Sequence, residues 1–448
     1  MKPLLLTALA VVGAIVGLVS RARADSSAIP PAIIHHELVV QGPLRYDTDF
    51  PALKYGGEAK HNRIARLQER LERGEVKLEF KPGRGYLDSL LKNLAIDPSS
   101  QLLVYSKTSL QAEFIRGANP RALYFNDDTS IGWENGAPLI EVMTVDSDLG
   151  IVFYAFPNRA EGAQRFDREG GRCLNCHDRY GMMGGGTPIF VETSTLSDVN
   201  GLILKPDDIV AVDDRTPIAQ RWAGWYVTGR SGKQTHLGNI QAHNVGDLAK
   251  LDQVKRANLD TLDSLFDTHP YITDKSDIVA LLVLEHESTV YNLITRLRFK
   301  LSTIPEQEAE RTPQQTRMIQ GLSEKLVQSL VFIGAAPLGD AVNGSSGFDS
   351  WFQAQGPRDS NGHSLRELDL RNRVFKYPLS FLIYSAAFDG LPQPTRAYVY
   401  QRLNAVLSGQ DVSRVYAGLP AAEKKTALEI LRATKLEFSA SLSQSTDK

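Results

Sequence analysis

The only two cysteines of this 448-residue chain, Cys173 and Cys176, lie three residues apart, and His177 follows the second one directly. An exported protein would ordinarily use such a pair for a structural disulfide. A disulfide here would close a very small loop, and a loop of that size stabilises a fold little. A role other than a structural cross-link is therefore needed to explain the segment Cys173-Leu174-Asn175-Cys176-His177.

The spacing of these three side chains matches the chemistry of covalent haem attachment. Two thiols bond to the two vinyl groups of the porphyrin, and a histidine directly after the second cysteine reaches the iron from one face. The sequence therefore predicts one covalently bound haem c, attached at Cys173 and Cys176, with His177 as the proximal iron ligand.

Three other interpretations of the cysteine pair were compared with this one. A structural zinc site needs four ligands and usually a second cysteine pair, which the chain lacks. A thioredoxin-like redox pair belongs at the start of a helix in a βαβ unit, whereas residues 169–172 and 178–186 are rich in glycine and predict a loop. A simple disulfide stays open as the third alternative.

The N-terminal residues 1–24 have the pattern of a secretory signal peptide. Lys2 precedes an apolar run from Leu4 to Val19, and Ala22-Arg23-Ala24 has the small-x-small form of a signal-peptidase site before Asp25. The pattern predicts a protein that is exported to the periplasm. Haem c is attached to proteins in that compartment. The alternative is an uncleaved membrane anchor, although the apolar run is slightly short for a spanning helix.

The charge balance excludes one class of partner. Loss of Lys2, Arg21 and Arg23 with the signal peptide takes the formal charge of the chain from −2 to −5. A weakly acidic mature protein argues against nucleic acid as a partner.

The order of sequence patterns predicts an α+β fold with a sheet-rich N-terminal half, a c-type haem loop and a mainly helical C-terminal half. We expect a helix pair and an antiparallel sheet in residues 25–160, the haem-attachment loop and a β-hairpin in 161–245, and helices in 246–448. The predicted helices span 58–73, 86–94, 247–266, 275–300, 313–333, 377–390, 393–409 and 420–436. The predicted strands span 101–107, 122–126, 139–144, 150–156 and 202–212, and the hairpin has strands 221–228 and 233–237.

The sixth ligand of the iron separates a closed electron carrier from an open catalytic site. His286 is the leading candidate because it falls on the apolar stripe of the helix predicted for residues 275–300. His236, on the return strand of the predicted hairpin, is the second candidate. Met182 and Met183 follow His177 too closely to reach the opposite face of the ring easily, and packing on the porphyrin suits them better.

Six further segments carry a pattern that extends beyond the pentapeptide. They are Gln101–Gln111 (QLLVYSKTSLQ), Pro120–Asp128 (PRALYFNDD), Arg221–Gly229 (RWAGWYVTG), His236–Asn239 (HLGN), Leu284–Glu287 (LEHE) and Phe375–Pro378 (FKYP). With these segments the chain resembles a family of large secreted proteins with one haem c motif, usually described only as cytochrome c domain proteins. The resemblance implies haem binding at Cys173 and Cys176, iron ligation by His177 and a role in electron transfer. It implies no sixth ligand and no substrate.

Three functions agree with these features. The first is periplasmic electron transfer with a redox partner protein. The second is a haem-dependent oxidoreductase acting on a small molecule such as peroxide or a nitrogen oxide, with His286 or His236 as acid/base or displaceable ligand and Arg221 or Arg296 as charge stabiliser. The third, a haem-based sensor, has no fused signalling domain to support it. Electron transfer is the function we expect first.

Overall fold

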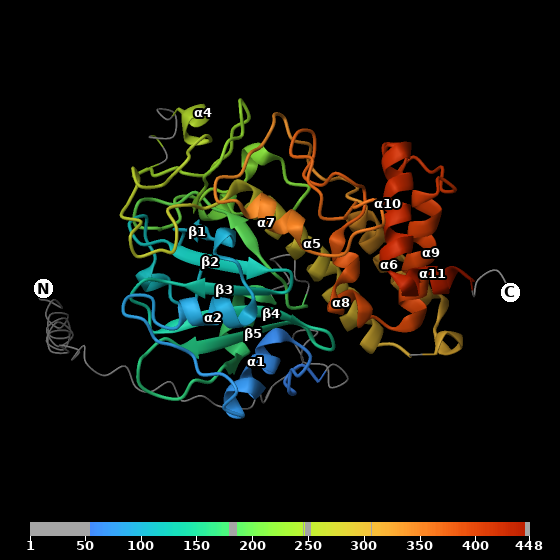
Figure 1. Cartoon of the computed structure of the whole chain (residues 1–448), viewed down its shortest axis with the longest axis horizontal. Coiled ribbons are helices and arrows are strands. Elements are labelled where there is room, and N and C mark those ends of the chain that lie inside the picture. Colours follow the sequence, from blue (N-terminus) through green and yellow to red (C-terminus); the bar gives the residue numbers. More distant parts are fainter. Residues whose placement is uncertain (1–53, 179–185, 245, 247–251, 306, 444–448) are drawn as a thin grey trace, which may run out of the picture. The chain divides into compact units, whose positions relative to one another are not determined.

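Seven antiparallel strands form the main sheet of this protein, described here from a computed structural model that covers residues 54–178, 186–244, 246, 252–305 and 307–443. Their order is β6-β5-β4-β3-β2-β1-β9, and Figure 1 shows the part from β1 to β5. The fold-class prediction of a sheet in the N-terminal half and helices in the C-terminal half is confirmed. The strands are β1 (Leu102–Val104), β2 (Arg121–Asn126), β3 (Thr129–Trp133), β4 (Leu139–Asp146), β5 (Gly150–Pro157), β6 (Asp167–Glu169) and β9 (Trp225–Tyr226).

Both faces of the sheet are buried. Successive side chains of a strand point to opposite faces, and on β5 they enter two different hydrophobic clusters. On β5, Val152, Tyr154 and Phe156 belong to the hydrophobic cluster formed with α1 (Arg63–Glu72) and α2 (Leu87–Leu94). Ile151 and Phe153 belong to a second cluster, formed with the C-terminal helices. The first cluster accounts for α1 and α2 lying against the sheet in Figure 1.

The two N-terminal helices lie inside the ranges predicted for them. Asn62 caps α1 by accepting a hydrogen bond from the backbone N–H of Ala65 at 2.9 Å. Helix α2 ends at Ala95, which takes a left-handed conformation. The signal segment predicted for residues 1–24 lies outside the described residues.

The 25-residue helix α5 (Ile278–Ser302) is the central helix of the C-terminal half and packs against β5 on one side and α6 (Pro313–Leu330) on the other. Asp277 caps it by accepting hydrogen bonds from the N–H groups of Val279 and Ala280. Among the described residues, no helix is both long enough and apolar enough to span a membrane. The other α-helices of this half are α4 (Gln253–Arg256), α7 (Phe348–Ala354), α8 (Ala386–Asp389), α9 (Gln393–Leu407), α10 (Ala421–Thr434) and α11 (Leu436–Ser443).

Two of the predicted helices are wrong. Residues 377–390 form a 3-10 turn (Phe381–Tyr384) followed by the four-residue α8, because Ser380 and Ser385 each cap a separate short segment. Within the described part of 247–266, only α4 is helical. The sequence also predicted strand 202–212, of which only β8 (Val210–Val212) is a strand, paired with β7 (Glu192–Ser194).

The predicted β-hairpin is also wrong. Of residues 221–228 only β9 is a strand, and it pairs with β1. The side chain of Asn239 takes the place of a return strand, since it accepts from the Val227 N–H at 2.8 Å and donates to the Val227 carbonyl at 2.7 Å. Side-chain amides compete with strand pairing in this way.

Candidate functional site

The cysteine pair and His177 lie on a short helix, α3 (Gly171–His177), where the sequence predicted a loop. Positions 173, 176 and 177 are separated by three and four residues, so their side chains share one face of the helix. The helix directly follows β6, the edge strand of the sheet. The two cysteines form no disulfide.

The imidazole of His177 is held by a backbone carbonyl twelve residues further along the chain. Its Nδ1 atom lies 2.8 Å from the Ile189 carbonyl oxygen, and the Ile189 N–H donates to the His177 carbonyl at 2.9 Å. The ring also packs on Phe153 of β5, with centroids 4.8 Å apart. Burial lowers the pKa of His177, which favours the neutral imidazole. A proton held on Nδ1 leaves the lone pair on Nε2, the arrangement that metal-binding histidines use.

The chemistry of the two thiols helps to test the alternatives. Burial raises the pKa of Cys173 to about 12, whereas reactive redox cysteines have lowered pKa values. For a metal alternative, three ligand side chains lie close enough to share an ion only at His61, Asp146 and Asp148 among the described residues. That group contains no cysteine. Two unpaired thiols and a neutral imidazole on one helix face therefore fit haem c better than zinc or a redox-active pair.

A buried polar cluster that sequence reasoning missed lies on the sheet near α3. Arg121 Nη2 lies 2.9 Å from Glu141 Oε2, and Arg121 Nε lies 3.3 Å from Glu134 Oε1. Ser109 donates to both carboxylates. The guanidinium crosses the sheet above Gly132, where a Cβ atom would lie 2.2 Å from Arg121 Nη2. Glycine at this position is what allows the arginine to lie flat on the strand.

The cluster acts electrostatically on Cys173 and His177. Arg121 and Glu141 contribute to the pKa shifts of both Cys173 and His177. The pKa of Glu134 is raised to about 8, mainly by burial of the carboxyl group and secondly by repulsion from Glu141. The sequence gives only a weak signal for this cluster. Charged residues that alternate with apolar residues along a strand, such as Arg121 and Glu141, ordinarily indicate the solvent-facing side of a sheet.

His286, the first candidate for the sixth ligand, has partners at both ring nitrogens. Nδ1 lies 2.9 Å from Asp214 Oδ2, and Nε2 lies 2.7 Å from Ser380 Oγ. The ring packs against Phe332 and Phe375, which stack on each other with centroids 4.8 Å apart. The arrangement has the order of a Ser-His-Asp triad, but Ser380 has no exposed surface for a substrate to reach. To bind iron, His286 would have to give up one of these hydrogen bonds.

His236, the second candidate, is buried against Trp222, with ring centroids 5.0 Å apart. Its Nδ1 accepts a hydrogen bond from the Gly238 N–H at 3.0 Å, and burial lowers its pKa to about 4. Trp222 in turn donates to Glu285, which also binds Arg221. The structure thus joins His236 and Arg221 in one buried network next to His286. Met182 and Met183 lie outside the described residues.

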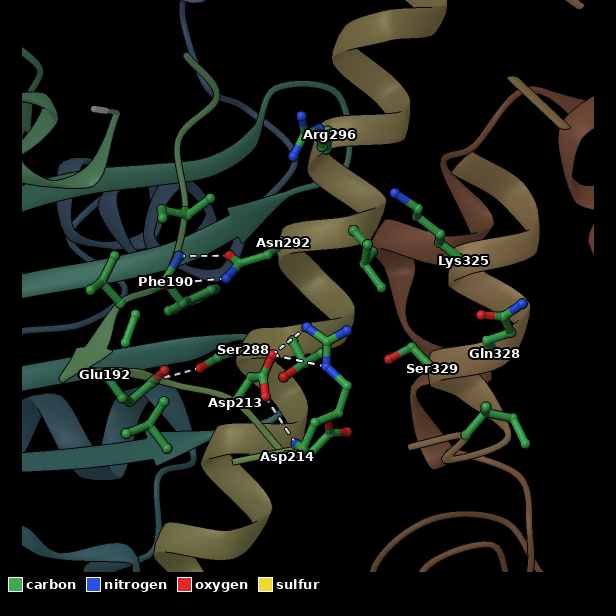
Figure 2. A pocket seen from close by; sticks show the side chains of 18 of the residues that line it. Phe190, Glu192, Asp213, Asp214, Ser288, Asn292, Arg296, Lys325, Gln328 and Ser329 are labelled. Carbon is green, nitrogen blue, oxygen red and sulfur yellow. Dashed lines mark hydrogen bonds and ion pairs between the residues drawn. The ribbon is translucent and has the colours of Figure 1, made fainter. Parts of the chain in front are cut away.

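A cavity of about 580 Å³ lies between α5, α6 and the β7–β8 pair (Figure 2). One wall is the segment that begins at Ile189, whose carbonyl contacts His177. Asn292 of α5 holds this wall, since its amide accepts from the Phe190 N–H at 2.7 Å and donates to the Phe190 carbonyl at 2.9 Å. Arg296, predicted as a possible charge stabiliser, also lines the cavity.

Comparisons of the chain with protein-family models, curated proteins and solved structures find no match.

Proposed function

We propose that this protein is an exported monohaem c-type cytochrome that transfers electrons in the periplasm. The observation that carries the proposal is the set Cys173, Cys176 and His177 on one face of α3, with His177 Nδ1 held by the Ile189 carbonyl. Haem c, when bound, supplies an iron that exchanges single electrons. Every part of the attachment chemistry comes from one seven-residue helix and the carbonyl that orients its histidine.

The residues of the site would divide the work as follows. Cys173 and Cys176 would hold the porphyrin edge through thioether bonds, and His177 Nε2 would be the proximal ligand. The Ile189 carbonyl keeps the imidazole in one tautomer and orientation, which sets the basicity of the ligand. Phe153 packs against the same ring and limits its rotation.

A haem-dependent oxidoreductase is the second candidate, and one observation favours it. The cluster of Arg121, Glu134 and Glu141 places charged groups in the protein interior near the attachment helix. An electron carrier has no need of a buried arginine and two carboxylates, whereas an enzyme uses such groups to bind or protonate a small substrate. His286, with both nitrogens engaged, leaves the other face of the iron without an assigned ligand.

Absorption spectra of the purified protein separate the two functions. We expect the oxidised and reduced spectra of a low-spin c-type haem, unchanged by carbon monoxide, for the electron carrier. High-spin iron that binds carbon monoxide would rule out the closed carrier and support the oxidoreductase.

Covalent attachment is tested by denaturing electrophoresis with haem staining. Cys173→Ala combined with Cys176→Ala removes both thioether bonds, so we expect no stain on the protein band. His243→Ala is a matched control for His177→Ala, because His243 is exposed. His177→Ala should change the spectrum while His243→Ala leaves it intact. A stained band in the double cysteine variant would refute the attachment itself.

A further inference from the structure

The cavity between α5 and α6 is divided by charge. Figure 2 shows Arg296 and Lys325 toward one end, and Glu192, Asp213 and Asp214 toward the other. A volume of about 580 Å³ is in the range of pockets that bind small organic molecules. The question is which end has unsatisfied charge.

The acidic end is already compensated. Arg215 binds Asp213 through Nε at 3.0 Å, and Asp214 binds His286. Burial raises the pKa of Glu192 to about 8, so this carboxyl is mostly neutral near pH 7 and accepts a hydrogen bond from Ser288. Of the three acids, Asp213 is paired with Arg215 and Glu192 is mostly neutral, so Asp214, hydrogen-bonded to His286, is the main source of repulsion for an anion at this end.

The cationic end has no such compensation. Neither Arg296 nor Lys325 has an ion-pair or hydrogen-bond partner within the part of the chain that the structure describes, and both side chains are exposed. Ser329, in the same wall, is buried, and its Oγ has no hydrogen-bond partner among the described residues. A buried hydroxyl without a partner is costly, and a ligand oxygen would satisfy it.

Apolar side chains make up much of the remaining lining, which also includes Thr289, Asn292 and Gln328. Ile189, Leu293, Leu322 and Ile333 line the space together with the polar groups. Such walls suit a ligand with a hydrocarbon body more than a bare inorganic ion.

We propose that this cavity binds a small organic carboxylate, with its anionic group at Arg296 and Lys325 and its apolar body along α5 and α6. Arginine presents a planar fork that matches a carboxylate, and lysine adds a second positive charge. The proposal stands on the cavity itself and does not depend on haem attachment at Cys173 and Cys176.

The test uses the purified full-length protein and isothermal titration with benzoate, benzamide and inorganic phosphate. Benzoate and benzamide have nearly the same shape and differ in charge. We expect benzoate to bind and benzamide to bind much more weakly, with phosphate weaker than benzoate because it lacks an apolar body. Equal affinities for benzoate and benzamide would overturn the proposal. A higher affinity for phosphate than for benzoate would overturn the claim that the ligand has an apolar body.

Substitutions then locate the site. Arg296→Gln and Lys325→Gln should each weaken benzoate binding about tenfold, because each removes one charge-assisted contact. Arg317→Gln is the matched control, since Arg317 is an exposed cation of the same helix α6 that does not line the cavity. Both cavity residues are exposed, so folding should be preserved. Unchanged benzoate affinity in the double variant Arg296→Gln/Lys325→Gln would place the binding elsewhere and refute the site.

Discussion

The Nδ1 atom of His177 lies 2.8 Å from the carbonyl oxygen of Ile189, twelve residues further along the chain. The next residue, Phe190, is held by both amide atoms of the Asn292 side chain. Helix α5 is thus connected to the imidazole of the attachment site through one short backbone segment. Asn292 is a positioning residue in this arrangement, because it acts on His177 only through Ile189 and Phe190.

The first prediction concerns this connection. Asn292→Ala removes both hydrogen bonds to Phe190, so we expect a loss of about 1–3 kcal/mol in the free energy of unfolding. A looser Ile189 carbonyl would weaken the bond to His177 Nδ1 and lower the basicity of the ligand. The reduction potential should then become more positive, at 59 mV for each 1.4 kcal/mol or so of differential stabilisation. Spectroelectrochemical titration measures this shift.

Asn93→Ala is the control for this variant. Asn93 Nδ2 donates to the Ser89 carbonyl at 2.8 Å within α2, away from the attachment helix. We expect it to alter stability with no change in potential. If Asn292→Ala lost stability but kept the potential of the unmodified protein, Asn292 would have a structural role only.

Much of the fold could be predicted from local patterns. Helices 275–300 and 313–333 and the strands at 139–144 and 150–156 have strong periodicity, and the structure confirms each with small shifts of the boundaries. Two of the failures occurred where side chains replace or interrupt backbone pairing. Asn239 substitutes for a hairpin strand, and Ser380 and Ser385 divide an apolar run into two short turns. Such contacts depend on tertiary placement that no local pattern encodes.

The candidate site could be predicted only where its signal is local in the sequence. The pentapeptide at 173–177 is a local signal, and the structure places its three side chains on one helix face. The residues around it come from distant parts of the sequence: Phe153 and Glu141 from neighbouring strands, Ile189 from a segment after α3, and Arg121 from a third strand. The sheet register brings the strand residues together, and Asn292 of α5 holds the segment that contains Ile189 and Phe190.

A second prediction concerns His286. His286→Ala leaves Asp214 and Ser380 without their partner and opens a cavity among aromatic rings, so unfolding should become easier by about 2–5 kcal/mol. If haem c is attached as proposed, we expect its absorption spectrum to stay unchanged, because both ring nitrogens of His286 are engaged by Asp214 and Ser380. His269→Ala, an exposed histidine, is the control for stability in urea denaturation. A spectrum altered by His286→Ala alone would instead assign His286 to the iron.

A third prediction concerns pH. The pKa of Glu192 is about 8 in the folded protein and near 4.5 when exposed, so between these values the folded state holds a proton that the unfolded state releases. Stability from this group is complete below pH 4.5 and is lost as pH rises toward 8, by up to about 1.4 kcal/mol per pH unit.

Glu192→Gln keeps the shape of the side chain and removes the titration. The variant should therefore gain stability relative to the unmodified protein as pH rises from 5 to 8, measured by urea unfolding at several pH values. Glu79→Gln, at an exposed position, is the control and should leave the pH profile as it was. Parallel profiles for Glu192→Gln and the unmodified protein would show that Glu192 does not titrate in this range.

The last prediction concerns Arg121, which is the only cation that pairs with Glu134 and Glu141 among the described residues. Arg121→Gln leaves the Glu141 carboxylate uncompensated beside Glu134, which at a pKa of about 8 is already mostly neutral near pH 7, and breaking a buried ion pair in this way costs about 3–5 kcal/mol. Adding Glu141→Gln removes the remaining charge, so the double variant should recover part of this loss. The reduction potential should become more negative in Arg121→Gln, because a nearby positive charge favours the reduced iron. A stability loss with an unchanged potential would mean that the cluster supports the sheet without acting on the attachment site.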